Sequence, residues 1–253
     1  MLRKECNGFV WFEFSSFQNL PVVHGCFSRL GGVSAPPFDS LNVGFFPEEN
    51  QEAVSHNRTL VQEQLFGTSQ GVLVDVDQVH GNEIVIVRSL DENRDKIEAD
   101  AMITDLPHVG LLIKHADCQA ALIVDPVHKV VANVHAGWRG SVKNIYQKVI
   151  GAMQEEWGSR PEDLHVGIGP SLGPQAFEFQ EWKELLPSFF HQFMIAENHI
   201  DFWEASVAQL RQAGVLHIEV ASLCTFSSPD LFFSFRRDRA SSGRNATCIA
   251  LRL

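Results

Sequence analysis

The sequence predicts an α+β fold in which strands outnumber helices. Short apolar runs, rich in β-branched and aromatic residues and bounded by turn residues, recur along almost the whole chain. Only three longer segments carry the i, i+3, i+4, i+7 spacing of an amphipathic helix. Because these segments do not alternate regularly with the strands, we expect α+β organisation and not a repeated βαβ unit.

The expected strands lie between turn signals throughout the chain. In order, they are residues 22–27, 72–76, 83–88, 101–104, 110–113, 120–124, 130–134, 164–168, 217–221, 231–235 and 247–251. The expected helices are residues 50–66, 141–157 and 202–213. Ser141 is the predicted N-cap of the second helix. Gly67, Gly158 and Gly214 follow the last periodic residue of each helix and are typical stops.

Composition indicates a globular protein and argues against two classes of partner. A chain of 253 residues, 45% of them apolar, can bury a substantial core, and no repeat, low-complexity tract or long linker divides it, so we expect one unit over residues 1–253. The formal net charge of -11 argues against a nucleic-acid surface and against adsorption to anionic lipid. Oligomeric state is left open.

The expected compartment is the cytoplasm. Five scattered cysteines without a Cys-x-x-Cys spacing argue against a disulfide framework. The N-terminal segment lacks an uninterrupted apolar stretch, and charged and polar residues interrupt the longest apolar region, residues 109–124. We therefore expect no membrane association.

Three residues are the leading candidates for chemistry: His80 in QVHGNE, Cys118 in HADCQA and His135 in NVHAGWRG. A single histidine is usually a hydrogen-bonded structural residue, but His80 and His135 each follow an apolar run and precede glycine or Ala-Gly, where the backbone can turn sharply. Two imidazoles and a thiolate are a set that a catalytic zinc uses, with its fourth position open. Cys118 could instead be a nucleophile activated by histidine and oriented by Asp117. Spacing alone leaves both readings open.

Arginines form a second group of candidates. Arg29, Arg58, Arg139, Arg236, Arg237 and Arg244 are mostly flanked by glycine, aromatic or strand residues. Such settings suit bidentate capture of phosphate or carboxylate. For Arg236 and Arg237, a solvated surface is an equally good interpretation.

The motifs together resemble the YfiH-like multicopper polyphenol oxidase, or laccase-domain, family. They are HGCFSRLGGVS, SLNVG, Asn57-Arg58, DQVHG, EADAMIT, HADC, HAGWRG, GIGPSLG, FFSFRRD and SGRNA, and they cover residues 24–252. The resemblance implies β-sheets packed together as a sandwich with helices outside, related to the catalytic domain of cytotoxic necrotising factor toxins. It also implies a metal site formed by His80, Cys118 and His135.

The resemblance implies purine nucleoside phosphorolysis, including that of methylthioadenosine, and adenosine deamination; older labels are copper-dependent polyphenol oxidase and peptidoglycan editing factor. Some positions depart from the family pattern. Gln119 and Ala120 stand where a residue and then proline are common, GPS with Ser171 replaces GPC, and Phe177-Glu178 replaces Tyr-Glu. These changes leave the three ligands untouched and concern substrate preference.

The expected activity is therefore a zinc-dependent purine nucleoside phosphorylase, with purine nucleosides and phosphate as partners. His80, Cys118 and His135 are the expected catalytic metal ligands, and Asp117 or Glu178 is the candidate for proton transfer. The candidate substrate- and phosphate-binding residues are Arg29, Asn42, Arg58, Arg139 and Arg244. Deamination would use a metal-activated water at the same open position.

Three alternatives remain. The first is a metal-free Cys-His hydrolase or amidase that edits peptidoglycan precursors. The second is a copper-dependent polyphenol oxidase: Cu²⁺ would bind such a site, but a multicopper cluster needs more histidines, and the sequence has no His-x-His pair. The third is a non-enzymatic zinc-bearing binding protein.

Overall fold

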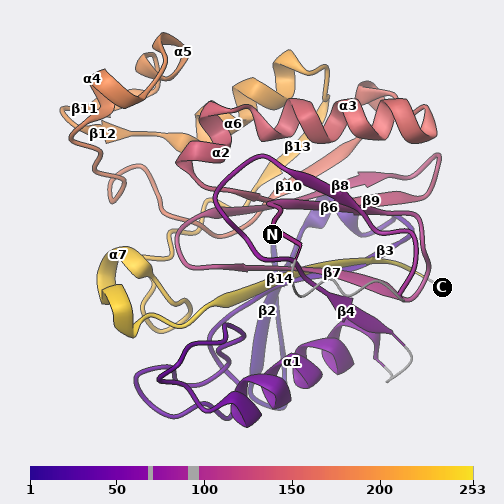
Figure 1. Ribbon diagram of the computed structural model, residues 1–253, viewed down its shortest axis with the longest axis vertical. Helices are drawn as coiled ribbons and strands as arrows, with labels where there is room; N and C mark the ends of the chain where they lie inside the picture. Colours follow the sequence, from indigo (N-terminus) through magenta and orange to yellow (C-terminus); the bar gives the residue numbers. More distant parts are fainter. Residues whose placement is uncertain (68–70, 91–96, 253) are drawn as a thin grey trace.

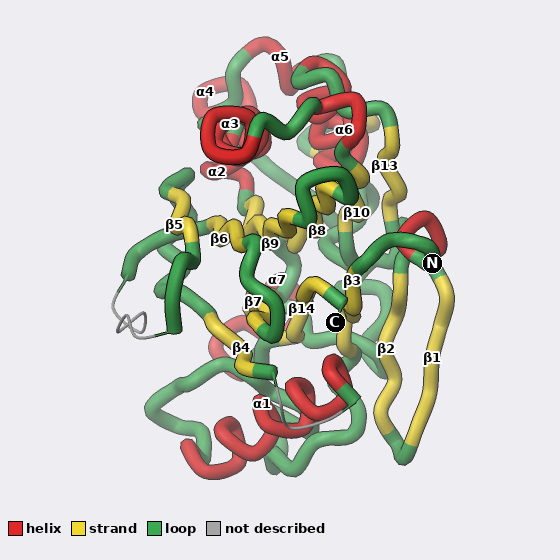
Figure 2. Tube along the Cα trace, turned by 90° about the vertical axis from the view of Figure 1, so that its right-hand side faces the viewer, coloured by secondary structure: helices red, strands yellow, loops and turns green. Residues whose placement is uncertain are grey.

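The computed structural model describes residues 1–67, 71–90 and 97–252 as two six-stranded sheets packed face to face, with helices outside. The layers are clearest in Figure 2. In spatial order, the first sheet contains β1 (Leu2–Cys6), β2 (Phe9–Glu13), β3 (Val22–Phe27), β14 (Asn245–Leu251), β7 (Val109–His115) and β4 (Val72–Val74). The second contains β13 (His217–Val220), β10 (His165–Ile168), β8 (Gln119–Asp125), β9 (Val130–Ala136), β6 (Ala101–Thr104) and β5 (Ile84–Ile86). Both sheets mix parallel and antiparallel pairs, which confirms the expected α+β class with mixed sheets.

The helices cover the outer faces of the sandwich. Helix α1 (Gln51–Phe66) lies on the first sheet, while α3 (Ile145–Trp157) and α6 (Phe202–Gln212) lie on the second (Figure 1). The shorter helices are α2 (Trp138–Val142), α4 (Trp182–Leu185), α5 (Ser188–His191) and α7 (Phe235–Asp238). A small hairpin, β11 (Met194–Ala196) and β12 (His199–Ile200), lies beside α4 and α5 in Figure 1.

Strand β8 shows how the sequence builds this layered core. Its side chains alternate: Leu122 and Val124 point into the layer between the sheets, while Ala121 and Ile123 point toward the α3 side. Because both faces are covered, every residue of β8 is buried. Burial of each large aliphatic side chain contributes about 1.5–3 kcal/mol, which makes this central strand a rigid support for the residues at its ends.

The ends of the long helices follow local capping chemistry. Asn50 caps α1 by accepting hydrogen bonds from the Glu52 and Ala53 amides, and Gly67 ends it with a φ of 65°. The predicted single helix 141–157 with Ser141 as N-cap is wrong. The chain instead forms α2 and then breaks at Asn144, whose φ of 51° suits asparagine and whose side chain caps α3. Ser141 lies inside α2.

The expected strand at residues 231–235 is also wrong, although the run is apolar and partly buried. The Phe233 amide donates to Asn245 Oδ1, and Asn245 Nδ2 donates to the Phe233 carbonyl, so a side chain satisfies the backbone in place of a neighbouring strand. Ser234 then caps α7. The other expected strands are present, each end within two residues of its predicted position.

Four strands were not predicted. The β1–β2 hairpin turns at Asn7 and Gly8, both with positive φ, and β1 is a largely exposed edge strand of charged residues without an apolar run. The strands β11 and β12 are three and two residues long, too short to give a periodic signal. None of the described helices is both long enough and apolar enough to cross a bilayer.

Candidate metal centre

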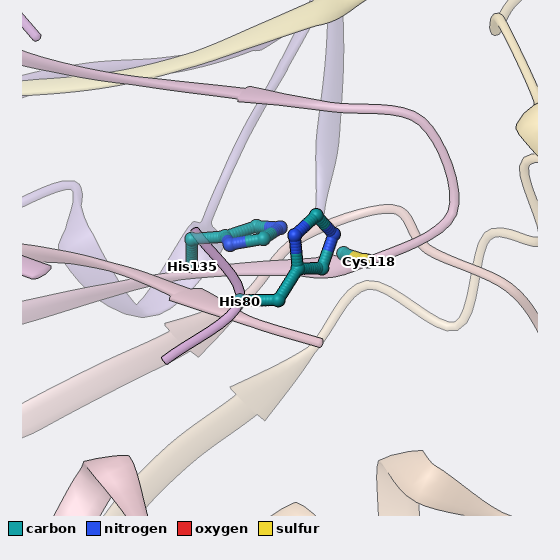
Figure 3. A group of neighbouring side chains, drawn as sticks. All are labelled: His80, Cys118 and His135. Carbon is teal, nitrogen blue, oxygen red and sulfur yellow. The ribbon is translucent and has the colours of Figure 1, made fainter. Parts of the chain in front are cut away.

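Three segments that are far apart in sequence bring His80, Cys118 and His135 together (Figure 3). His80 lies in the loop after β4, Cys118 in the turn between β7 and β8, and His135 near the end of β9. One ligand atom from each lies within 4.8 Å of the others. His135 is thus inside its strand, while the other two lie between strands.

Sheet register explains why Cys118 and His135 meet. Strands β8 and β9 pair antiparallel with Gln119 opposite Ala136 and Ala120 opposite His135. Cys118 immediately precedes the first residue of β8, so it lies beside the last residues of β9. The hairpin therefore fixes the separation of these two ligands through its backbone hydrogen bonds.

Asp100 places His80 and orients the ring of His135. Its buried carboxylate accepts hydrogen bonds from the amides of His80 and Gly81 and also contacts His135 Nδ1 at 2.7 Å. A carboxylate only accepts, so His135 Nδ1 carries the proton and Nε2 is left as the metal-binding atom. Burial alone would raise the pKa of Asp100, but the hydrogen bonds from His135 and the two amides hold it below its usual value.

Cys118 is prepared to act as a thiolate. Burial favours the neutral thiol, but the charge and hydrogen bond of His135, together with a hydrogen bond from His80, lower the pKa of Cys118 to about 6. In return, although burial disfavours the imidazolium, Cys118 and Asp100 raise the pKa of His135 to about 9. In the metal-free protein the pair is therefore a thiolate beside an imidazolium, which suits a metal ligand or a nucleophile.

Gly137 leaves room for the cluster. A Cβ at this position would lie 3.1 Å from His80 Cδ2 and 3.2 Å from Cys118 Sγ. The HAGWRG motif thus places glycine where any larger residue would press on two candidate ligands at once. Two imidazoles, a thiolate, a partner for one ring and this open space together fit a zinc ion.

A cavity of ≈ 290 Å³ opens beside the cluster. Cys118, Gly137 and Gln119 lie on one side of it. Its other walls are mainly aromatic and cationic; they include Trp138, Phe177, Phe202, Phe235, Arg236 and Arg239. Aromatic faces beside cationic groups are suited to a flat heterocycle that carries or meets an anion.

The two candidate carboxylates for proton transfer differ in position. Asp117 lines the cavity, but its oxygens accept hydrogen bonds from the Thr225 hydroxyl at 2.6 Å and from the Arg236 amide at 2.5 Å. Glu178 is exposed, contacts Gln180 and does not line the cavity. Of the two, only Asp117 is brought to the cavity.

Three of the predicted phosphate- or substrate-binding residues lie elsewhere. Arg29 pairs with Asp39, and Arg58 pairs with Asp75; neither lines the cavity. Asn42 is buried and bonds the backbone of Gly44 and Arg244. The geometry gives these three residues supporting contacts, and their predicted roles remain predictions.

The other two arginines lie close to the cavity. The exposed Arg139 places its guanidinium 4.4 Å from the centre of the Trp138 ring, which lines the cavity. Arg244 lies 5.9 Å from the ring of Phe235, another lining residue. Burial lowers the pKa of Arg244, and the charges of Cys118 and Asp117 oppose that change, which places it within electrostatic reach of the cluster.

Sequence reasoning left out Asp100 and Arg239 and left the role of Arg236 undecided. Asp100 lies in EADAMIT, just before β6, and a carboxylate directly before an apolar run was the available signal. Arg236 was weighed equally as a solvated surface residue, yet it lines the cavity. Arg239 stands in the same basic run, in FFSFRRDR, and gave no separate signal.

Comparison with known proteins bears on the identity of this architecture. A family model described as multi-copper polyphenol oxidoreductase laccase matches residues 23–252. The chain belongs to this laccase-domain family. The crystal structure of YlmD from Geobacillus stearothermophilus superposes with a TM-score of 0.87 at 30% identity, covering 99% of this chain and 98% of that one.

Curated members of the laccase-domain family carry a phosphorylase name. Purine nucleoside phosphorylase YlmD of Bacillus subtilis is 31% identical over 251 residues, which are 92% of this chain and 90% of that protein. Purine nucleoside phosphorylase YfiH of Escherichia coli is 31% identical over 233 residues, 88% of this chain and 91% of that protein. The resemblance inferred from the motifs is thereby confirmed.

Proposed function

We propose that this chain is a zinc-dependent purine nucleoside phosphorylase acting as one unit over residues 1–253. The reaction converts adenosine, inosine, guanosine or S-methyl-5′-thioadenosine and phosphate into the free base and ribose-1-phosphate or its methylthio analogue. The observation that carries this proposal is the close approach of His80, Cys118 and His135 beside an aromatic and cationic cavity. The names of the relatives at 31% identity support the same reaction class.

The donor atoms favour zinc as the resident ion. Imidazole and thiolate together are common zinc ligands, and a three-ligand site keeps a position open for substrate. When bound, the ion supplies a Lewis acid and lowers the pKa of a coordinated water. Asp100 holds the proton on His135 Nδ1, and the β8–β9 register holds Cys118 beside it.

The cavity side chains bind and orient the two substrates. Phe177, Phe202 and Trp138 offer ring faces or edges for a purine, and they exclude water from it. Cleavage at C1′ passes through an oxocarbenium-like state, which a nearby phosphate anion stabilises and then captures. Departure of the base needs a proton, for which Asp117 is the better placed candidate and Glu178 the weaker one. Adenosine deamination is proposed as a side activity of the same site.

The decisive experiment separates phosphorolysis from the alternatives. Purified protein is analysed for metal, and adenosine, inosine and methylthioadenosine are incubated with and without phosphate and followed by HPLC. We expect phosphate-dependent release of base, lost after chelation and in Cys118→Ala. The matched control is Cys6→Ala, which removes an exposed thiol. Base release that does not require phosphate would sink the proposal.

A second candidate is a metal-free hydrolase or amidase acting on a peptidoglycan precursor. The observation that favours it is the Cys118–His135–Asp100 series, in which the pKa of Cys118 falls to about 6. Complete removal of metal distinguishes it, because such a thiol enzyme would retain activity on a peptide precursor and react with an alkylating agent at Cys118.

Copper oxidation, named in the family description, is the weaker candidate. Across the described residues, His80, Cys118 and His135 form the one group of three or more side chains that could hold a metal ion. A multicopper cluster requires several more histidines. A Cu²⁺ ion could still occupy the same ligands. We further propose a cytoplasmic location, and the relation to cytotoxic necrotising factor stays a prediction.

A further inference from the structure

Most arginines that the structure describes in this acidic protein fall into two groups. Members of the first lie beside a carboxylate. The pairs are Arg3–Glu5, Arg29–Asp39, Arg58–Asp75, Arg88–Glu156, Arg160–Glu162 and Arg237–Asp238. By contrast, no ion pair within residues 1–67, 71–90 and 97–252 includes Arg139, Arg236, Arg239 or Arg244, and all four lie in or beside the cavity. Arg211 and Arg252 also make no ion pair in these ranges, but neither lines the cavity, and Arg211 donates to the carbonyls of Val215 and Leu216. In a chain of net charge -11, this clustering of unpaired cations indicates an anionic ligand.

Arg236 is held firmly from two sides. Its amide donates to Asp117 Oδ2, and its Nη2 donates to the Glu178 carbonyl at 2.9 Å. The other carboxylate oxygen of Asp117 accepts from Thr225, so Asp117 connects α7 to the turn that carries Cys118. One guanidinium contact is used, and the remaining donors of the fork stay available to a ligand.

Arg239 lines the same cavity as Arg236. It is exposed and begins the short 3₁₀ helix Arg239–Ser241, directly after α7. In the described part of the chain, no hydrogen bond or ion pair of its side chain competes with a ligand. Two arginines three residues apart that line one cavity, one anchored and one exposed to solvent, can bracket a tetrahedral anion.

The only acidic side chain lining this cavity does not neutralise them. Among the described lining residues it is Asp117, and both of its oxygens already accept hydrogen bonds. Arg244 and Arg139 add further positive charge beside the lining residues Phe235 and Trp138. Two cationic side chains and Cys118 therefore line one cavity of ≈ 290 Å³.

We propose that Arg236 and Arg239 form a phosphate subsite in the same cavity as Cys118. The ligand is a phosphate dianion, either inorganic phosphate or the phosphate group of a sugar phosphate. As a site for the co-substrate, the subsite rests on the proposed function; as a site for phosphate, it can be tested without any reaction. It shifts phosphate recognition away from Arg29 and Arg58, which are occupied by Asp39 and Asp75.

The test is calorimetric titration of the metal-loaded protein with inorganic phosphate, and separately with ribose 5-phosphate, in the absence of nucleoside. The variants are Arg236→Gln, Arg239→Gln and Arg239→Lys, with Arg88→Gln as a control that removes an equal charge from an exposed ion pair outside the cavity. Metal content and thermal melting are measured for each. Arg239 can be changed safely because its side chain is exposed.

We expect each glutamine variant to weaken phosphate binding at least about tenfold, Arg239→Lys to weaken it less, and Arg88→Gln to leave it unchanged. Tighter binding of ribose 5-phosphate that the glutamine variants also lose would support the subsite and identify the sugar phosphate as its ligand. Equal affinities in all variants, no binding of either probe by the parent protein, or loss of binding only in Cys118→Ala would overturn it. Phosphorolysis that persists with an unchanged phosphate KM in Arg236→Gln and Arg239→Gln would refute the subsite and leave the proposed function standing.

Discussion

Asp100 Oδ1 lies 2.7 Å from His135 Nδ1, and this contact decides which nitrogen of His135 faces Cys118. The same carboxylate accepts hydrogen bonds from the backbone amides of His80 and Gly81. One buried residue therefore places two of the three candidate ligands. Partners of this kind orient ligands and raise their basicity, and their loss typically costs about 10–100-fold in metal affinity.

Asp100→Asn should therefore weaken zinc binding by about 10–100-fold while the protein still folds. The asparagine side chain can still accept a hydrogen bond from the backbone N–H of His80 or Gly81. It has no negative charge with which to hold His135. Competition with a chromogenic chelator gives the affinity, and Asp230→Asn, at an exposed position, is the control. Equal affinities in the two variants would show that Asp100 is only structural.

Gly137→Ala should reduce zinc affinity by about tenfold or more, because the new methyl group would lie 3.1–3.2 Å from His80 and Cys118. The backbone of Gly137, with a φ of -75°, accepts alanine without strain, so the effect comes from crowding alone. Gly151→Ala is the matched control: a Cβ added there would have no heavy atom within 4 Å, and alanine favours its helix. Metal content and activity are measured on both variants. Unchanged zinc binding in Gly137→Ala would contradict the prediction that the methyl group crowds His80 and Cys118.

Asp117→Asn separates a positioning role from proton transfer. An amide offers one acceptor oxygen where the carboxylate has two, so the Arg236 amide keeps its partner only if the Thr225 hydroxyl turns to accept from the amide nitrogen, and the negative charge is lost in either case. We expect the free energy of unfolding to fall by about 1–3 kcal/mol and the phosphate KM to rise. Denaturant unfolding and the pH profile of kcat are the measurements. A large fall in kcat with unchanged stability would instead assign Asp117 to proton transfer.

His24 should make the protein less stable in mild acid. Its Nε2 accepts a hydrogen bond from the Phe14 amide at 2.7 Å, which requires the neutral ring, and burial lowers the pKa of His24 from 6.5 to about 4. Between these values the unfolded chain binds more protons than the folded one, so stability falls as pH is lowered from 6.5 to 4. The contribution of His24 to that fall is about 3 kcal/mol.

Urea unfolding of His24→Gln at several pH values checks this, since glutamine can accept the same amide without titrating. We expect the acid-induced loss of stability to be smaller in His24→Gln than in the parent protein. The control is His56→Gln, at an exposed position of α1, which should retain the full loss. Parallel stability curves for all three proteins would rule out the proposed titration.

Local chemistry made much of the fold predictable. The short apolar runs of β8 and β14 and the cap at Gly67 act within a few residues, so the sequence carries them directly. The strand predicted at residues 231–235 failed because a distant residue satisfied its backbone. Asn245 bonds Phe233 on both its amide and its carbonyl, which no pattern around residues 231–235 reveals.

By itself, the sequence determined the α+β class and the motifs of the laccase-domain family. It also identified His80, Cys118 and His135 as the candidate metal ligands. Only the tertiary structure decided which side chains surround them. Asp100 reaches His135 because β6 pairs with β9, and Arg236 joins the cavity because Asp117 holds α7. Arg29 and Arg58 instead form ion pairs with Asp39 and Asp75. Sequence spacing identifies the chemical groups, whereas strand register and competition among charges decide which of them meet.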